Sequence, residues 1–246
     1  MIDQTIIFIS AVFVLAGFVK GVIGLGLPTV AMGLLAITMP PVEAAAILVL
    51  PSFVTNAWQM LAGPSLTGVI RRLWPMMVGI CIGTWAGLGL MTGAAGGYAT
   101  SILGVALAVY AISGLAALRL PAPKQWEGGL STLVGAITGI ISAATGVFVI
   151  PAVPYLQAIG FETEELVQAL GLSFTVSTLA LTVNVAAAGA IQPAMAAGAG
   201  IALGMACLGM WAGQALRRRL APNVFRRWFF VGLLGLGVYL VAKSLI

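Results

Sequence analysis

Long apolar runs, interrupted by few charged residues, dominate the pattern of this chain of 246 residues. The stretches without Asp, Glu, Lys or Arg cover residues 44–70, 73–118, 128–161 and 166–216. A helix needs about 20 apolar residues to cross a bilayer, so the chain has room for about eight to ten membrane segments and for no water-soluble domain. The pattern therefore predicts an all-α polytopic membrane protein.

The apolar segments form two similar sets. Three uninterrupted segments are expected in each set, at 42–62, 73–91 and 98–118 in the first and at 165–188, 194–216 and 228–245 in the second. A motif supports the division, because Cys81, Gly83, Trp85, Ala86, Gly87 and Leu90 recur in order 126 residues later as Cys207, Gly209, Trp211, Ala212, Gly213 and Leu216. We therefore divide the chain into a first membrane repeat (1–118), a cytoplasmic linker (119–128) and a second membrane repeat (129–246).

Each set begins with an interrupted element. The first is a helix over 5–24 followed by a Gly/Pro break at 24–28, and the second has its break at 142–146, followed by Pro151 and a stop at Gly160. Pro removes a backbone donor and Gly loosens a helix. The polar backbone groups at such a break must face protein or water rather than lipid.

Composition narrows the possible functions. The chain is 61% hydrophobic and 7% charged, with a mean hydropathy of +1.13, whereas soluble domains have about 25% charged residues. It contains no His, which excludes histidine-based catalysis and His-ligated metals. We expect no enzyme activity, cofactor or metal. The net charge of +5 comes mainly from arginines beside membrane segments, which indicates topology rather than nucleic-acid binding.

The distribution of basic residues favours an odd number of passes per copy. With four passes, the basic residues outside the spans divide evenly between the two sides. With five passes, or a re-entrant pair of the same parity, Lys243 lies on one side and nine others lie on the opposite side: Arg71, Arg72, Arg119, Lys124, Arg217, Arg218, Arg219, Arg226 and Arg227. The positive-inside rule selects the second arrangement. It predicts two inverted repeats, each a broken or re-entrant helix pair plus three transmembrane helices, with both termini in the periplasm. Such repeats are typical of secondary transporters.

Lys20 is the one formal charge well inside a predicted span, four residues before the first break. An ionisable residue in a span is costly and usually faces a cavity. Two interpretations stay open: a role in anion binding or gating, or snorkelling to the headgroups or structural pairing.

The two breaks are the second candidate feature. A helix that begins near Pro28 or Pro151 directs unpaired N–H groups and its positive dipole end at the break, which favours an anion. We expect the substrate to contact Gly24, Gly26, Pro28, Thr29, Ser142, Thr145 and Gly146. The alternative is that these glycines only allow close helix packing.

Uncharged polar residues on the helix after each break are the third feature. Ser52, Thr55, Asn56 and Gln59 share one helix face, and Ser173 and Ser177 lie on the matching segment of the second copy. Such a stripe either lines a cavity or bonds helices together. We favour the cavity and include Ser52, Asn56, Ser173 and Ser177 in the substrate site.

The break motif resembles a known family. The pattern Gly17-x-x-Lys20-Gly21-x-x-Gly24-x-Gly26-x-Pro28, repeated in weaker form as Gly135-x-x-Thr138-Gly139 with Gly146 and Pro151, is similar to the sulfite exporter TauE/SafE family, also called the toluenesulfonate uptake permease family. The second copy departs from it, with Ala143-Ala144-Thr145 where a denser glycine run is usual. The resemblance implies a transporter of sulfite, sulfonates or related organic anions in the bacterial inner membrane.

Three functions compete on this evidence. The first is a secondary transporter of a small organosulfur anion. The second is an anion channel, or a carrier for a non-sulfur organic anion such as a carboxylate. The third, a membrane enzyme or assembly factor, lacks the acid–base groups it would need. Beyond the anion and the lipid bilayer, the sequence leaves open a coupling proton or sodium ion and a homodimer.

Overall fold

The computed structural model describes residues 4–93, 96–116, 126–192, 195–217 and 222–244. Within these ranges the regular elements are helices: α1 (Gln4–Ile23), α2 (Leu27–Leu35), α3 (Pro41–Leu61), α4 (Leu66–Ala86), the 3-10 turn η1 (Gly96–Tyr98), α5 (Ala99–Leu115), α6 (Glu127–Thr145), α7 (Ala152–Ala158), α8 (Thr163–Ala187), α9 (Ala196–Arg217) and α10 (Pro222–Lys243). The all-α prediction is confirmed.

Eight of the helices are long and apolar enough to cross a membrane: α1, α3, α4, α5, α6, α8, α9 and α10. The other two, α2 and α7, have nine and seven residues. At 1.5 Å per residue they reach about 14 Å and 10 Å, well short of the hydrocarbon core of about 30 Å. The chain is therefore a multi-pass membrane protein with a long helix and a short helix in each broken element.

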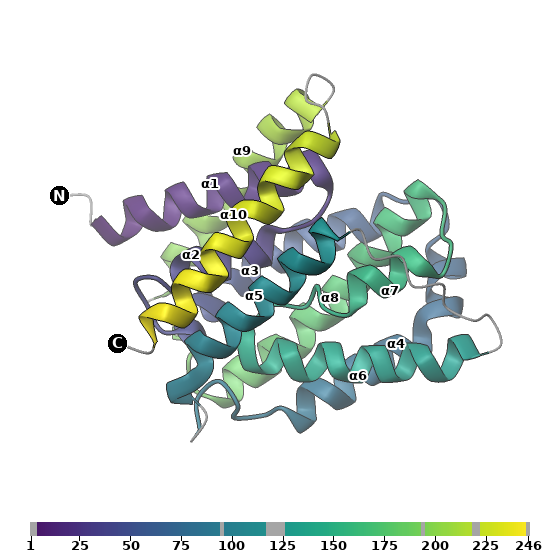
Figure 1. Ribbon diagram of the computed structural model, residues 1–246, viewed down its shortest axis with the longest axis horizontal. Helices are drawn as coiled ribbons and strands as arrows, with labels where there is room; N and C mark the ends of the chain where they lie inside the picture. The colour runs from purple at the N-terminus through teal and green to yellow at the C-terminus, as the bar shows by residue number, and fades with distance from the viewer. Residues whose placement is uncertain (1–3, 94–95, 117–125, 193–194, 218–221, 245–246) are drawn as a thin grey trace.

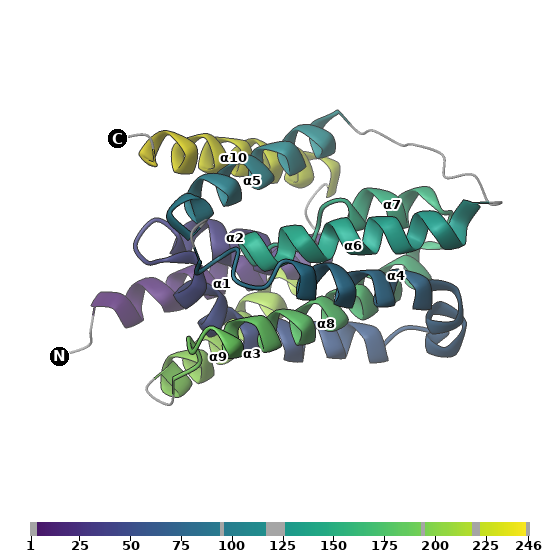
Figure 2. The same ribbon diagram turned by 90° about the horizontal axis from the view of Figure 1, so that it is seen from below.

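The long helices pack in pairs. Helix α1 packs along α9, α4 along α6, α3 along α8 and α5 along α10. In Figure 1 the α1–α9 pair lies at one edge and the α4–α6 pair at the opposite edge, with α3 and α8 between them. Figure 2 shows α5 and α10 as a separate layer above the others. Helix α2 is enclosed by α1, α3, α5 and α10, and eight of its nine residues are buried. Helix α2 is thus an interior element, whereas α7 is only partly buried.

Glycines allow the edge pairs to pack closely. A Cβ at Gly17 or Gly21 would collide with the backbone of α9, and a Cβ at Gly135 or Gly139 would collide with the backbone of α4. These four residues hold equivalent places in the two copies of the break motif. Their requirement for glycine is therefore explained by helix packing.

Several segment boundaries differ from the prediction. Helix α4 begins at Leu66, so Arg71 and Arg72, expected in a loop, lie inside a helix. Helix α10 begins at Pro222 rather than at 228, so Arg226 and Arg227 also lie inside a helix. The second break was expected at 142–146, but α6 continues to Thr145 and the chain leaves the helix at Gly146. The linker at 119–128 lies mostly outside the described residues, as do Arg119, Lys124, Arg218 and Arg219.

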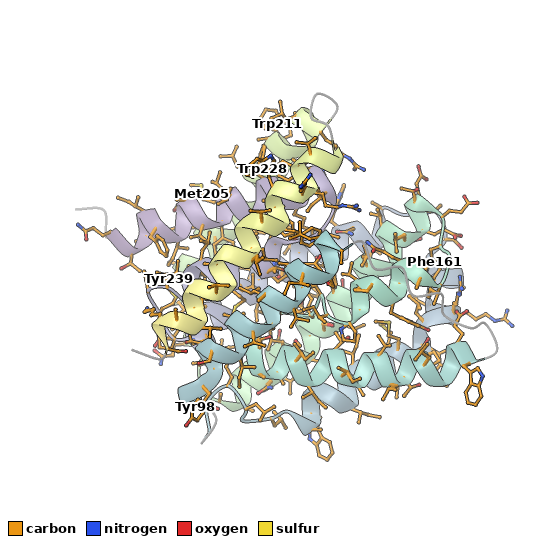
Figure 3. The ribbon with its side chains drawn as sticks, in the orientation of Figure 1. Tyr98, Phe161, Met205, Trp211, Trp228 and Tyr239 are labelled. Carbon is orange, nitrogen blue, oxygen red and sulfur yellow. The ribbon has the colours of Figure 1, made fainter. Side chains whose placement is uncertain are left out.

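The outer surface is apolar and carries aromatic residues near the helix ends. Trp211 lies near the end of α9 and Trp228 near the start of α10, whereas Tyr239 lies toward the other end of α10 and Tyr98 lies at the start of α5 (Figure 3). Amphipathic rings of this kind favour the two membrane interfaces. The matched Cys81 is also exposed on the helix surface, away from the interior.

Candidate functional site

Lys20 is buried in the protein interior, between α1 and α3. Its side chain is 4% exposed. The Nζ atom donates to Oγ1 of Thr55 at 3.2 Å and to Oδ1 of Asn56, both on α3. The ammonium group is held in the interior, so the snorkelling interpretation is wrong. The contacts to Thr55 and Asn56 are nevertheless a form of structural pairing, which the sequence left open.

The charge of Lys20 is not neutralised by an acidic side chain. In the described part of the chain, the ion pair formed is that between Arg72 and Glu127, and the partners of Lys20 are a hydroxyl and an amide oxygen. A buried charge is costly unless it is paired and hydrogen-bonded. An anion next to Lys20 would supply the opposite charge.

A cavity of about 480 Å³ reaches Lys20, and we call it the Lys20 cavity. Its walls come from α1, α3, α8 and α9 and from the first break at Gly24. Thr55 and Gln59 of α3 line it, as does Gln214 of α9, a polar residue that the sequence interpretation did not include. The volume lies within the range of about 300–1,000 Å³ that small-molecule sites occupy.

The first break is formed by two glycines in left-handed conformations. Gly24 has φ 78° and Gly26 has φ 103°, a region that L side chains rarely adopt. The N–H of Gly24 still bonds to the carbonyl of Lys20 at 2.8 Å, and α2 then begins at Leu27 with Pro28 in its first turn. The position of this short helix agrees with the prediction, and its first backbone N–H groups point toward the break.

The second break touches the first broken element. Gly146 has φ 70° and ends α6, and a Cβ there would lie 2.8 Å from Cε of Met32 on α2. The hydroxyl group of Thr145 is already hydrogen-bonded to the backbone. Its Oγ1 donates to the carbonyl of Ile141 at 2.7 Å and accepts from the N–H of Val147 at 3.1 Å. The two broken elements therefore meet at Gly146 and Met32.

Six of the predicted site residues carry a buried polar atom without a hydrogen-bond partner among the described residues: Thr29, Ser52, Asn56, Ser142, Ser173 and Ser177. Buried polar groups are normally bonded to protein, water or ligand. Nearby threonines differ, since Oγ1 of Thr55 donates to the carbonyl of Pro51 at 2.8 Å and Oγ1 of Thr175 to that of Gly171 at 2.7 Å. The four serines, Asn56 and Thr29 are therefore free to bind a ligand, whereas Thr55 and Thr175 are not.

The cavity and the predicted site overlap only at their edge. Of the predicted site residues, Lys20 and Gly24 line the cavity, and the remainder are placed in the two breaks and on the buried faces of α3 and α8. Lys20 joins the two regions, because it faces the cavity and bonds to Asn56.

A polar network holds α7 against α4 and α6. The sequence did not indicate this network. Arg72 pairs with Glu127 through two bonds of 2.5 and 3.0 Å, and it also donates to the carbonyl of Ile159 at 2.7 Å. The hydroxyl of Tyr155 donates to the carbonyl of Glu127 at 3.1 Å and lies 2.5 Å from Oγ of Ser131. The end of the second broken element is thus tied to α4 and α6.

Two glutamines join α3 to α8 beside the cavity. The Nε2 atom of Gln59 donates to the carbonyl of Val167 at 2.9 Å. Gln168 is fully buried, accepts the N–H of Ser65 at 2.8 Å and donates to the carbonyl of Met60 at 2.8 Å. Gln59, which the sequence placed in the polar stripe, therefore serves helix-to-helix bonding.

The chain matches a known protein family over most of its length. Residues 9–240 match the family model described as sulfite exporter TauE/SafE. No curated protein and no solved structure matches the chain.

Proposed function

The chain belongs to the sulfite exporter TauE/SafE family, and from this membership we propose that it is a secondary transporter of sulfite, a sulfonate or another small organosulfur anion. The match extends over both membrane repeats. Members of the family are membrane transporters and not enzymes, and the eight candidate spans agree with a multi-pass membrane protein. We place the protein in the bacterial inner membrane.

Lys20 is the observation that carries the proposal. A buried ammonium group, bonded to two neutral side chains and open to a cavity, attracts an anion more strongly than it would in water. A charged side chain in a membrane segment is energetically unfavourable. An anionic substrate that neutralises the charge would offset this cost.

The substrate site in this proposal lies between the two breaks near the bilayer midplane. The first N–H groups of α2 and the positive end of its dipole are available to an oxyanion. Ser52 and Asn56 on α3, with Ser173 and Ser177 on α8, offer buried polar atoms on the adjacent helices. Backbone and hydroxyl donors of this kind bind an oxyanion with few charged side chains, which suits a chain that is 7% charged.

We further propose that the two copies are inverted repeats. Helix α1 packs along α9 as α6 packs along α4, which is the relation expected if α1 corresponds to α6 and α4 to α9. In Figures 1 and 2, α1 begins at the left of the molecule and α6 begins at the right. The start of α1 and the end of α10 lie at the same end of the molecule (Figure 1). These arrangements support a location of both termini on the same side of the membrane, and the positive-inside rule favours the periplasm as that side.

Cysteine labelling tests this topology. We expect the substituted positions Ser65→Cys and Val224→Cys to react with an impermeant reagent from the cytoplasmic side, and Gln4→Cys and Ser244→Cys to react from the periplasmic side. The labelling is done with Cys81 and Cys207 replaced by Ser, because both native cysteines are exposed. Labelling of positions 65 and 224 from opposite sides would contradict the inverted arrangement.

A ligand screen followed by flux measurements tests the transport function. Because a ligand stabilises the folded protein by mass action, we expect sulfite or a sulfonate to raise the melting temperature of the purified protein more than a carboxylate does. In proteoliposomes, uptake should saturate and support counterflow. Uptake that does not saturate and shows no counterflow would identify a channel, and stabilisation by carboxylates alone would reject a sulfur anion.

A further inference from the structure

A second cavity lies beside the first break, on the side away from α9. It has a volume of about 490 Å³ and is bounded by α5, α7, α8 and α10; we call it the Arg226 cavity. Figure 2 shows α5 and α10 as the layer above α6 and α7, and the cavity lies between these layers. Ile23 and Thr163 line both cavities, so the two are neighbours that flank the same break.

The charge of the Arg226 cavity has one sign. Among the described residues that line it, Arg226 of α10 is the one charged side chain, and no acid lines it. The Lys20 cavity differs, because Glu164 lines it together with Lys20 and Arg217. Arg226 forms no ion pair with the described residues. A guanidinium group in this position presents a planar set of donors that suits an oxyanion.

A buried hydroxyl provides a second donor. The side chain of Tyr110 is 2% exposed and lines the cavity, and its OH has no partner among the described residues. The ring is fixed in an edge-on contact with Phe230, with ring centroids 5.2 Å apart. The amide of Gln157 on α7 also lines the cavity. An unpartnered buried OH is unfavourable unless a ligand or water bonds to it.

The remaining lining residues are mostly apolar, with Ser113 of α5 and Thr163 of α8 as the polar exceptions. The apolar ones include Leu25 from the first break, Leu166 of α8 and Phe230 of α10. An ion as small as sulfite would leave these surfaces empty, whereas an oxyanion that carries an apolar group would cover them. The charge selects the head of the ligand and the apolar walls select its other end.

We propose that the Arg226 cavity is a second anion site, distinct from the Lys20 site, and that it binds an oxyanion carrying an apolar group. The oxyanion contacts Arg226, the OH of Tyr110 and the amide of Gln157, and the apolar group packs on Leu25 and Phe230. Such a ligand comes either from an organic sulfonate in solution or from an anionic phospholipid. The class of free ligand rests on the proposed function, but the site itself does not.

Binding stoichiometry tests the proposal. Benzenesulfonate is titrated calorimetrically into the purified protein, and we expect two binding events per chain. Arg226→Gln should remove one event, and Lys20→Gln should remove the other. Arg227→Gln is the matched control, since Arg227 is adjacent to Arg226 and likewise exposed but does not line the cavity. It should retain both events.

Tyr110→Phe separates a ligand contact from a structural role. Because the OH has no partner among the described residues, its removal breaks no hydrogen bond to them and should not lower the melting temperature. Binding at the second site should weaken by about 2- to 10-fold, the value of one hydrogen bond. Unchanged affinity would exclude the OH from the site.

Native mass spectrometry distinguishes the two sources of ligand. If a lipid occupies the cavity, wild-type protein retains an anionic phospholipid that Arg226→Gln loses, and benzenesulfonate shows its second event only after delipidation. The proposal is overturned if Arg226→Gln binds benzenesulfonate with wild-type stoichiometry and retains the same lipids. Failure of Lys20→Gln to remove an event would instead reject the Lys20 site and leave the Arg226 site standing.

Discussion

The two broken elements have the same design but different chemistry. In the first, Lys20 faces a cavity, and a Cβ at Gly24 would meet no atom within 4 Å. In the second, Thr138 holds the position that matches Lys20, and its Oγ1 donates to the carbonyl of Val134 at 2.8 Å. The end of α7 is tied down by Arg72. In the proposed transporter, the first broken element supplies the charge and the open space for a ligand, and the second supplies a fixed wall.

The largest effect is expected where the two elements meet. Gly146→Val should abolish anion binding, because the residue has φ 70° and its Cβ would lie 2.8 Å from Met32. Gly26→Val should act in the same way from the first break, where φ is 103° and a Cβ would lie 3.1 Å from Cγ1 of Val19. Equilibrium binding of sulfite or a sulfonate to the purified variants measures the loss.

Gly189→Val is the matched control for this prediction. Gly189 also has φ 70°, but a Cβ there would meet no atom within 4 Å. The control therefore carries the same backbone strain without crowding the site, and it should bind the anion while losing some stability. Undiminished binding in both break variants would show that the breaks are packing devices alone.

The next effect contrasts the charged position with its neutral counterpart. Lys20→Gln should weaken anion binding by about 10- to 100-fold, the value of a charge-assisted hydrogen bond, while the protein still inserts and folds. Lys20→Arg should restore binding in part, because the guanidinium is larger and planar. Thr138→Val should change binding little. Normal transport by Lys20→Gln below saturation would leave Lys20 with structural pairing alone.

A smaller effect is expected at Arg72, where a role in stability can be separated from a role in anion binding. Arg72→Gln should lower the free energy of unfolding by about 1–3 kcal/mol, because it removes charged bonds to Glu127 and a bond to the carbonyl of Ile159. The exchange of Arg72→Glu with Glu127→Arg should recover part of this loss. Chemical denaturation provides the readout. If Arg72→Gln weakens anion affinity as much as Lys20→Gln does, the division of roles between the copies is wrong.

The smallest effect concerns single hydroxyl groups. Ser177→Ala should weaken binding by about 2- to 10-fold, because its Oγ is buried and has no partner among the described residues. Thr175→Val serves as the control on the same helix, since Oγ1 of Thr175 is already bonded to the carbonyl of Gly171. Equal affinities of the two variants would remove Ser177 from the site.

Features that depend on local composition could be predicted from the sequence. The lone charge in an apolar run identified Lys20, and the Gly/Pro clusters located both short helices to within a few residues. The start of α4 was predicted wrongly because two adjacent arginines, Arg71 and Arg72, are typical of a loop between spans. In the structure Arg72 is compensated by Glu127, 55 residues away along the chain, and such a partner has no local signal.

The features that could not be predicted depend on contacts between segments that lie far apart in the sequence. Met32 reaches Gly146 across the core, and Gln168 joins α8 to the end of α3. A Met or Gln in a helix has no spacing that reveals its partner. The sequence therefore identified the polar residues of the candidate site but not the cavity that approaches it or the network that fastens α7.

The central claim is that the anion binds at Lys20 between the two breaks, and a structure with a bound heavy analogue tests it most directly. Selenite replaces sulfite, with Cys81 and Cys207 changed to Ser because exposed thiols react with selenite. We predict one selenium anomalous peak within hydrogen-bonding distance of Lys20 Nζ and beside Gly24–Thr29, absent in Lys20→Gln. A peak away from both breaks, or one that persists in Lys20→Gln, would contradict the account.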